Sequence, residues 1–170
     1  ETEIMKVVVI TGASSGIGLQ YATVLAEKYK KDLVLVSNQE KELEEAAKDI
    51  AEKYGVKAIA LYKDLSTETA PQEVYDFCKE NNIEVEILIN NAGVFYFNDL
   101  CKTSEARINL MLHLHIRTVT QMCRLFGMDM RERGKGYILN MSSMSAWMTM
   151  PGIQCYNASK SYILNFSRSM

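Results

Sequence analysis

Short apolar runs alternate along the chain with longer segments in which apolar residues recur at helical spacing. The runs are rich in Val, Ile and Leu and nearly continuous, a pattern typical of parallel strands buried on both faces. They predict strands at 6–11, 32–37, 56–62, 86–90 and 136–142. The segments of helical spacing predict helices at 16–30, 40–54, 69–81, 104–133 and from 155 onward. This alternation indicates an α/β fold, a Rossmann-like doubly wound parallel sheet.

The pattern runs through the chain without a linker, internal repeat or low-complexity segment, so we expect residues 1–170 to form a single domain. With 170 residues, 48% of them hydrophobic and 24% charged, the chain has enough apolar side chains for one core. It begins with Glu1. A processed end, a removed upstream segment and a natural start at Met5 all stay open from the sequence.

Charge and cysteine usage narrow the class of partner and the compartment. The formal net charge of −2 offers no basic field for nucleic acid or an anionic membrane surface. No apolar stretch approaches the ~18 to 20 residues that a membrane-spanning helix needs, and the first residues lack the apolar centre of a signal peptide. Cys78, Cys101, Cys123 and Cys155 lie far apart and form no CxxC pair, so we expect reduced core thiols in a cytoplasmic protein.

A glycine-rich segment follows the first expected strand directly. Residues 11–18 read TGASSGIG and place Gly12, Gly16 and Gly18 in the turn that opens the first helix. Glycine permits a positive φ and close approach of the backbone to a ligand, while a helix N-terminus offers free N–H groups and a partial positive charge. The turn predicts a cradle for a diphosphate, although its spacing also fits a turn that only joins strand to helix.

Further polar motifs follow the later strands. The pair Asp64-Leu65 comes after the third strand, and the sequence NNAG, residues 90–93, after the fourth. After the fifth strand come Ser143 and then YNASK, residues 156–160. Ligands of open α/β sheets bind outside the carboxyl ends of the strands, so we expect these motifs to meet in one site.

The order of these motifs, TGxxxGxG, D-L, NNAG, S and YxxxK, resembles that of the classical short-chain dehydrogenases/reductases, and the resemblance spans residues 4–170. It implies the doubly wound fold. It also implies an oxidoreductase that transfers a hydride between a nicotinamide dinucleotide and a small-molecule carbonyl or secondary alcohol.

By that resemblance three residues form the catalytic group. Tyr156 is implied as the acid/base, Lys160 as its cationic partner and ribose ligand, and Ser143 as the hydrogen-bond donor to the substrate oxygen. Residues four apart on a helix share a face, which agrees with a paired Tyr156 and Lys160. An ammonium about 4 Å away stabilises a tyrosinate by roughly 4 kcal/mol at an effective dielectric near 20. Taken alone, the pair also suits an ordinary amphipathic helix.

The resemblance also implies a set of cofactor-binding residues at the turns that follow the strands and on the catalytic helix. They are Gly12, Ser14, Ser15, Gly16, Ile17, Gly18, Ser37, Asn38, Asp64, Leu65, Asn91, Ala92, Gly93, Tyr156 and Lys160. After the second strand, an acid would bind the ribose of NAD and a basic residue the 2′-phosphate of NADP. Asn38 is neutral and Lys41 lies in the next turn, so we favour NADP and keep NAD as the second candidate.

One position departs from the family's pattern. Many members carry an asparagine twenty-eight residues before the catalytic serine, and its backbone helps to hold a water against the lysine. Here that position is His115, which the resemblance makes the fourth catalytic residue; Asn109 takes its place only if the register slips by six. A buried histidine with no role in the site is the alternative. His113 and His115 point to opposite sides of a helix, so we expect no metal site.

The chain ends ten residues after Lys160, whereas the family's fold ordinarily continues with a strand, a loop over nicotinamide and substrate, and an edge strand. We therefore expect a sheet that is incomplete at the C-terminus, in a truncated form without turnover. Apolar residues after NNAG and after Ser143 predict a roomy apolar pocket: Val94, Phe95, Tyr96, Trp147, Met148 and Met150. In this region the sequence is similar to 3-ketoacyl and hydroxysteroid reductases.

Helices 104–133 and 155–170 carry more apolar residues than one face of a sheet requires. The surplus comprises Leu110, Met111, Leu114, Val119, Met122 and Phe126 on the first helix and Tyr162, Ile163 and Phe166 on the second. We expect these helices to form a homo-oligomer, a dimer or tetramer.

Two other functions stay open, a dinucleotide-binding regulator without turnover and an inactive fragment of a longer enzyme. Retention of Tyr156 and Lys160 favours the enzyme.

Overall fold

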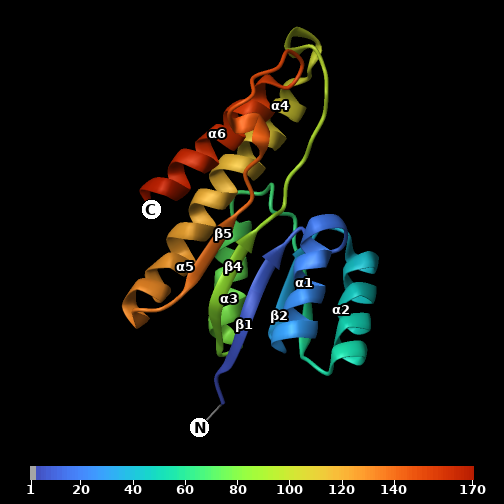
Figure 1. Ribbon diagram of the computed structural model, residues 1–170, viewed down its shortest axis with the longest axis vertical. Helices are drawn as coiled ribbons and strands as arrows, with labels where there is room; N and C mark the ends of the chain where they lie inside the picture. Colours follow the sequence, from blue (N-terminus) through green and yellow to red (C-terminus); the bar gives the residue numbers. More distant parts are fainter. Residues whose placement is uncertain (1–2) are drawn as a thin grey trace.

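The computed structural model describes residues 3–170, which form a five-stranded parallel sheet with helices on both faces (Figure 1). The strands are β1 (Met5–Thr11), β2 (Asp32–Ser37), β3 (Ala58–Tyr62), β4 (Ile83–Asn90) and β5 (Tyr137–Asn140). Their order is β3-β2-β1-β4-β5, and every pair is parallel. The chain winds outward from β1 in one direction and then in the other, which leaves a switch point between β1 and β4. The expected Rossmann-like doubly wound sheet is confirmed.

Two clusters of apolar side chains hold the helices to the sheet. The helices are α1 (Gly16–Tyr29), α2 (Glu40–Tyr54), α3 (Ala70–Glu80), α4 (Glu105–Leu112), α5 (Val119–Arg133) and α6 (Gln154–Ser169). On β1, Val8 and Ile10 pack with α1 and α2, while Val7 and Val9 pack with α3 and α5. Successive side chains of a strand point to opposite faces, so a continuous apolar run serves both clusters.

The long helix expected at 104–133 contains a wider turn. A π-helical segment, His113–Thr118, joins α4 to α5 without a break in the helical run. The other bounds differ at the ends: β4 begins at Ile83, earlier than expected, and β5 is confined to Tyr137–Asn140. Apolar periodicity gives no sign of one extra residue in a helical turn, which is why the sequence predicted a uniform helix.

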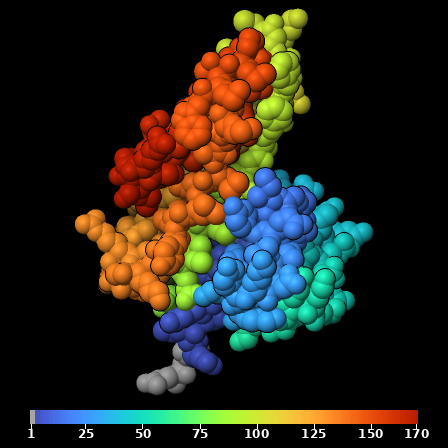
Figure 2. All heavy atoms as spheres, viewed as in Figure 1, coloured from blue at the N-terminus to red at the C-terminus, as the bar shows by residue number. Residues whose placement is uncertain are grey.

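The carboxyl ends of the strands point toward the end of the molecule where α4, α6 and the segment after β4 lie (Figure 1). In the space-filling view the C-terminal part, coloured orange to red, packs beside the yellow-green segment that follows β4 (Figure 2). β1 begins at the opposite end (Figure 1). Residues that follow different strands are therefore collected at one end of the fold.

Two expectations about individual side chains need correction. Cys78 and Cys123 are buried, but Cys101 is exposed and Cys155 only half-buried, so the thiols are unpaired without all being core residues. Most of the apolar surplus expected on the long helix packs inside the protomer: Met111, Leu114, Val119, Met122 and Phe126 are all buried, as is Ile163 of α6. The wide apolar face of α5 was mistaken for a free surface. It is wide because α5 packs against the sheet, α3 and α6 at once.

Over residues 3–170, none of the helices combines the length and the hydropathy that crossing a membrane requires. Within the same residues, no group of three or more His, Cys, Asp and Glu side chains is arranged to hold a metal ion.

Candidate active site

The glycine turn between β1 and α1 lies against the turn after β4. Gly12 has a φ of +66°, and a Cβ atom there would lie 2.9 Å from the Cα of Ala92. A Cβ atom on Gly18 would collide with the carbonyl oxygen of Gly12 and approach the Asn91 Nδ2 to 2.6 Å. Only glycine fits such a conformation and such close packing. The turn therefore brings the N-terminus of α1 to the switch point of the sheet.

Hydrogen bonds lock these two turns together. The side-chain amide of Asn91 donates to the carbonyl oxygens of Thr11 and Gly12, both at 3.2 Å. The hydroxyl oxygen of Thr11 accepts from the backbone N–H groups of Asn91 and Ala92, both at 3.0 Å. The NNAG and TGxxxGxG motifs, about eighty residues apart in sequence, thus form one rigid edge.

A cleft of about 370 Å³ opens along this edge. It is lined by ten of the residues expected to bind the cofactor, Gly12, Ser14, Ser15, Ser37, Asn38, Asp64, Leu65, Asn91, Ala92 and Gly93. Gly16, Ile17 and Gly18 belong to the same turn but are not among the lining residues, and Ile17 is exposed. The carboxylate of Asp64 accepts hydrogen bonds from the N–H and the hydroxyl of Ser66, which hold its pKa below its ordinary value. It therefore offers the cleft a charged acceptor.

Five lining residues were not expected at the cleft from the sequence: Gln39, Lys63, Ser66, Leu110 and Leu114. Lys63 is the one basic residue along the cleft in the part of the chain that the structure describes, whereas Lys41 is exposed and not among the lining residues. The Lys63 ammonium lies 2.6 Å from a carboxylate oxygen of Glu73. Its position directly before Asp64 was a signal that could have identified it.

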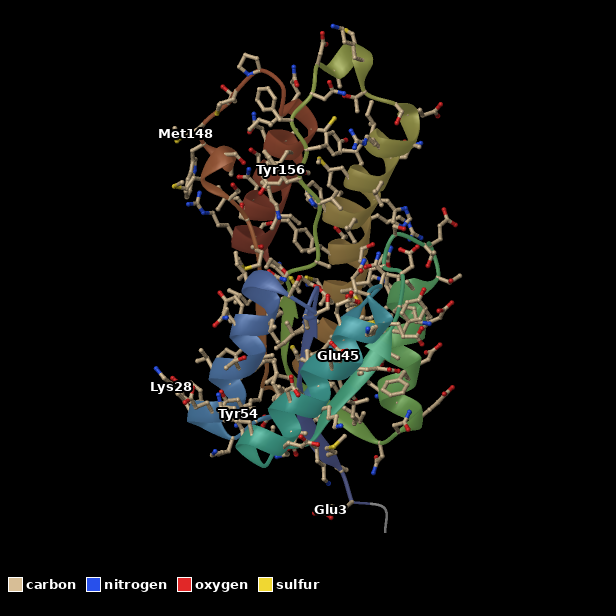
Figure 3. The ribbon with its side chains drawn as sticks, turned by 90° about the vertical axis from the view of Figure 1, so that its right-hand side faces the viewer. Glu3, Lys28, Glu45, Tyr54, Met148 and Tyr156 are labelled. Carbon is tan, nitrogen blue, oxygen red and sulfur yellow. The ribbon has the colours of Figure 1, made fainter. Side chains whose placement is uncertain are left out.

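Tyr156 and Lys160 lie one helical turn apart on α6, and neither is among the residues that line the cleft. Figure 3 shows Tyr156 on α6 in the upper part of the molecule. Lys160 is only 8% exposed, its Nζ donates to the carbonyl oxygen of Met141 at 2.9 Å, and it lies 5.7 Å from the centre of the Tyr156 ring. Burial lowers the pKa of Lys160. The Tyr156 ring makes edge-to-face contacts with Phe95 and His115. A cation is therefore held against the phenol by the packing of α6.

Ser143 begins a short turn, Met144–Ala146, directly after β5. Its Oγ accepts hydrogen bonds from the N–H and the hydroxyl of Ser145, at 3.2 Å and 3.0 Å. The preceding residue, Ser142, donates to the carbonyl oxygen of Lys160 at 2.8 Å. This contact, together with that of Met141, brings Ser143 to the helical turn that carries Tyr156 and Lys160.

His115 is buried, with 1% of its surface exposed, and both ring nitrogens have partners. Nε2 accepts from the N–H of Val94 at 2.9 Å, and Nδ1 lies 2.9 Å from the Ser159 Oγ. Burial, reinforced by the nearby charge of Lys160, lowers the pKa of His115 to about 4. Asn109 is exposed on α4. Of the two residues considered for this position, His115 is the one in contact with Tyr156.

The apolar residues expected around the substrate lie in three different surroundings. Val94 lines the cleft and Phe95 contacts Tyr156. Tyr96 instead donates its hydroxyl proton to the carbonyl oxygen of Arg107 on α4. Trp147, Met148 and Met150 are exposed on the segment before α6, where Figure 3 shows Met148 at the surface. This segment presents apolar side chains to solvent beside the site.

A family model described as short chain dehydrogenase matches residues 6–170. Curated relatives include very-long-chain 3-oxoacyl-CoA reductases. The Anas platyrhynchos protein is 34% identical over 172 residues, covering 95% of this chain and 53% of the relative. The Homo sapiens protein is 32% identical over 169 residues, covering 95% and 52%. A further human relative, "Inactive hydroxysteroid dehydrogenase-like protein 1", is 34% identical over 169 residues, covering 95% and 49%. The chain spans about half the length of the curated relatives it matches.

Solved structures of the same architecture include complexes with NADPH. A short-chain dehydrogenase from Sphingobium yanoikuyae in complex with NADPH matches with a TM-score of 0.90 and 30% identity, over 98% of this chain and 64% of that chain. L-sorbose reductase from Gluconobacter frateurii, complexed with NADPH and L-sorbose, matches with a TM-score of 0.90 and 31% identity, over 98% of this chain and 63% of that chain.

Proposed function

Because the chain belongs to the short-chain dehydrogenase family, we propose that the protein transfers a hydride between NADP and a ketone or secondary alcohol. The observation that carries this proposal is the pairing of Tyr156 with the buried Lys160, whose Nζ lies 5.7 Å from the centre of the Tyr156 ring. A phenol next to a held ammonium is suited to give up and regain a proton. The cleft offers room for a dinucleotide along the carboxyl ends of the strands.

Each residue of the catalytic group has a distinct task in this proposal. A bound nicotinamide supplies or accepts the hydride. In reduction the Tyr156 hydroxyl gives its proton to the carbonyl oxygen of the substrate, and in oxidation the tyrosinate removes the proton of the alcohol. The charge of Lys160 stabilises the tyrosinate. Ser143 donates a hydrogen bond to the substrate oxygen, which lowers the cost of negative charge there.

The residues present fit a dinucleotide. Gly12 and Gly18 allow the turn to pack against the segment after β4, a Cβ atom on Gly16 would meet no atom within 4 Å, and the adjacent N-terminus of α1 suits a diphosphate. Asp64 supplies an acceptor from the end of β3, and Lys160 would bind the ribose of the nicotinamide. We favour NADP because Asn38 carries no acid and Lys63 adds a cation to the cleft, with NAD as the second candidate. The NADPH in two related structures agrees with this choice.

An apolar ketone is the substrate class that the surroundings favour. Val94, Leu110 and Leu114 line the cleft, and Phe95 packs against Tyr156. The relatives named very-long-chain 3-oxoacyl-CoA reductase make a 3-oxoacyl thioester the first compound to test. A steroid-like ketone is the second.

A dinucleotide-binding protein without turnover is the competing function. It is favoured by the human relative whose name calls it inactive. The experiment is to follow NADPH fluorescence while the intact protein is incubated with a panel of ketones that includes a 3-oxoacyl thioester. Oxidation that depends on the ketone supports the enzyme. Tight NADPH binding without reduction of any ketone supports the competing function.

The proposal extends to association and location. Two copies would pair through α4, α5 and α6, where Leu110, Leu112 and Tyr162 remain exposed. Sedimentation at several protein concentrations tests this pairing. A protein that stays monomeric throughout the micromolar range would contradict it. A cytoplasmic location and a lack of nucleic-acid partners stay predictions, and the unpaired cysteines support the first of these.

A further inference from the structure

His115 bridges two parts of the site that are distant in sequence. It lies in the π-helical segment His113–Thr118, a kind of turn that often marks functional sites. On one side its Nε2 accepts from the N–H of Val94, in the segment after β4, at 2.9 Å. On the other side its Nδ1 lies 2.9 Å from the hydroxyl of Ser159 on α6.

The direction of these hydrogen bonds fixes the protonation of the ring. Nε2 accepts a hydrogen bond from the N–H of Val94 and so carries no proton, which leaves the proton of the neutral imidazole on Nδ1. Nδ1–H then donates to the Ser159 Oγ, and the Ser159 hydroxyl donates to the carbonyl oxygen of Tyr156 at 3.0 Å. Three directed hydrogen bonds therefore connect the backbone of Val94 to the peptide group of Tyr156.

The packing around the ring leaves no room for another arrangement. Ser159 is fully buried, like the histidine. A Cβ atom on Gly93 would lie 2.9 Å from His115 Nε2, so only glycine at that position allows the ring its place. The ring also meets the Tyr156 ring edge to face, with centroids 5.7 Å apart. The charged group that faces this cluster is the ammonium of Lys160, which lies next to Tyr156 on α6.

We propose that His115 is a positioning residue for Tyr156, acting as a neutral Nδ1–H imidazole that ties α6 to the segment after β4 and never carrying the transferred proton. This inference rests on the proposed function. A proton on Nε2 would face the N–H of Val94, donor against donor, in a buried site near the Lys160 ammonium. Protonation would therefore break the connection.

Nitrogen NMR tests the tautomer without any need for turnover. The chain contains two histidines, so a sample labelled with ¹⁵N-histidine gives two imidazole spin systems, and His113→Asn assigns them. We expect the His115 ring to show a protonated Nδ1 and an unprotonated Nε2, unchanged from pH 8 to pH 5. A protonated Nε2, or titration of the His115 ring near its ordinary pKa of about 6.5, would overturn the proposal.

Kinetics test the positioning role. His115→Asn keeps a donor for Ser159 and loses the acceptor for Val94, and His115→Gln does the opposite. His115→Ala and Ser159→Ala break the connection on one or both sides. We expect kcat to fall about 10- to 100-fold in His115→Ala, because a displacement of about 1 Å costs up to about 10²-fold. The Asn and Gln variants should lie between His115→Ala and the wild type, with the KM for NADPH unchanged throughout.

The control is His113→Asn, a neighbouring substitution in the same π-helical segment, which should leave kcat unchanged. Combining His115→Ala with Ser159→Ala should add little to the loss from the first substitution alone, since both act through one connection. A kcat for His115→Ala within twofold of the wild type would refute the positioning role. If the intact protein reduces none of the ketones with NADPH, the proposed function fails, while the NMR result still decides the tautomer.

Discussion

The side-chain amide of Asn91 donates a hydrogen bond to the carbonyl oxygen of Gly12, 3.2 Å away. This contact joins the turn after β4 to the turn after β1, and it leaves space for no side chain at Gly18. The shape of the cleft therefore depends on two turns being held together.

Gly18→Ala should disrupt this junction. The added methyl group would collide with backbone atoms of Gly12, which cannot move aside as a flexible side chain would. We expect a loss of about 1–3 kcal/mol in the free energy of unfolding and weaker NADPH binding. Urea denaturation and NADPH fluorescence titration measure the two effects. Gly127→Ala is the control, because its methyl group would meet only the flexible end of Met170 and the tip of Ile138.

Tyr156→Phe should abolish turnover and preserve cofactor binding. The phenylalanine ring keeps the contacts with Phe95 and His115 but has no proton to give. We expect kcat in the intact protein to fall by at least about 10³-fold, with the Kd for NADPH changed less than about threefold. Tyr162→Phe, on the same helix, should retain full activity. Activity of the Tyr156 variant within tenfold of the wild type would remove Tyr156 from the acid/base role.

Cofactor preference should respond to Lys63 more than to Lys41. We expect Lys63→Met to weaken NADPH binding about tenfold and to leave NADH binding nearly unchanged, since only NADPH carries the 2′-phosphate. Glu73→Gln, which removes the carboxylate paired with Lys63, should strengthen NADPH binding. Titration of both reduced cofactors against each variant measures the preference. Binding of NADH at least tenfold tighter than NADPH by the wild type would show that the choice of NADP is wrong.

Acid should destabilise the fold through His115. Its folded pKa of about 4 lies below the unfolded value of 6.5, so below pH 6.5 the unfolded chain takes up a proton that the folded chain refuses. Stability that is fully present above pH 6.5 is therefore lost as the pH falls toward 4. The loss from this group amounts to about 3 kcal/mol.

Urea unfolding at pH 7 and pH 5 checks this effect. The fall in unfolding free energy between the two values should be smaller in His115→Gln, which cannot titrate, and unchanged in His113→Asn. Equal falls in the wild type and both variants would mean that the acid sensitivity comes from other groups.

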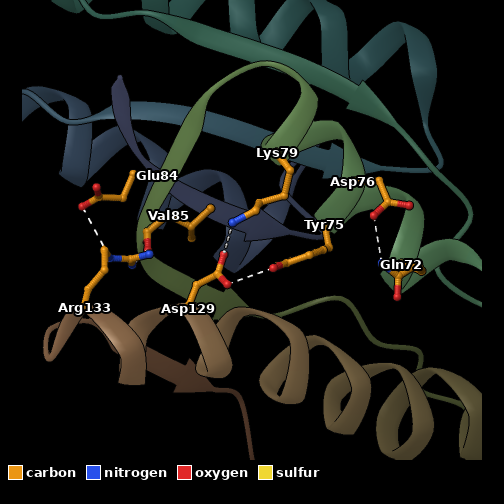
Figure 4. Close-up of polar contacts among 8 residues, drawn as sticks. All are labelled: Gln72, Tyr75, Asp76, Lys79, Glu84, Val85, Asp129 and Arg133. Carbon is orange, nitrogen blue, oxygen red and sulfur yellow. Dashed lines mark hydrogen bonds and ion pairs between the residues drawn. The ribbon is translucent and has the colours of Figure 1, made fainter. Parts of the chain in front are cut away.

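The contact between α3 and α5 should depend on Asp129. Its carboxylate accepts from the Tyr75 hydroxyl at 2.8 Å and from the Lys79 ammonium at 3.0 Å (Figure 4). Asp129→Ala leaves a half-buried hydroxyl without its acceptor, which costs about 1–2 kcal/mol. Asp76→Ala is the matched control, because Asp76 pairs only with Gln72 on the exposed side of α3 (Figure 4). In thermal unfolding, Asp129→Ala should lower the stability and Asp76→Ala should change it little. Neither substitution should affect NADPH binding.

The sheet and the cleft were largely predictable from the sequence, because local rules govern them. A continuous apolar run such as that of β1 satisfies both faces of the sheet by itself. The glycine turn carries its own backbone requirements. Strand ends of a parallel sheet meet at one edge whatever the details of packing, so Asp64 and Asn91 were expected at the cleft before their contacts were known.

What the sequence did not predict depends on tertiary packing. The partners of His115 come from two segments, one after β4 and one on α6, and no spacing rule brings Val94 and Ser159 to the same ring. Lys63 was not predicted because the basic residue was expected directly after β2, whereas the cleft extends to the neighbouring strand β3. The apolar surplus on α5 was misinterpreted because one helix contacts α3, α6 and the sheet.

The wide turn between α4 and α5 constrains how this region can change in evolution. A π turn holds about one residue more than an α turn, so loss of one residue from His113–Thr118 would restore a regular turn and change which neighbours the residues of this segment face. His115 could then no longer face Ser159 while Thr118 kept its 2.6 Å hydrogen bond to the carbonyl oxygen of Leu65. A substitution in this segment changes the contacts of one residue, but an insertion or deletion changes the contacts with the cleft and with the catalytic helix together. Its length should therefore be inherited more strictly than its amino acids.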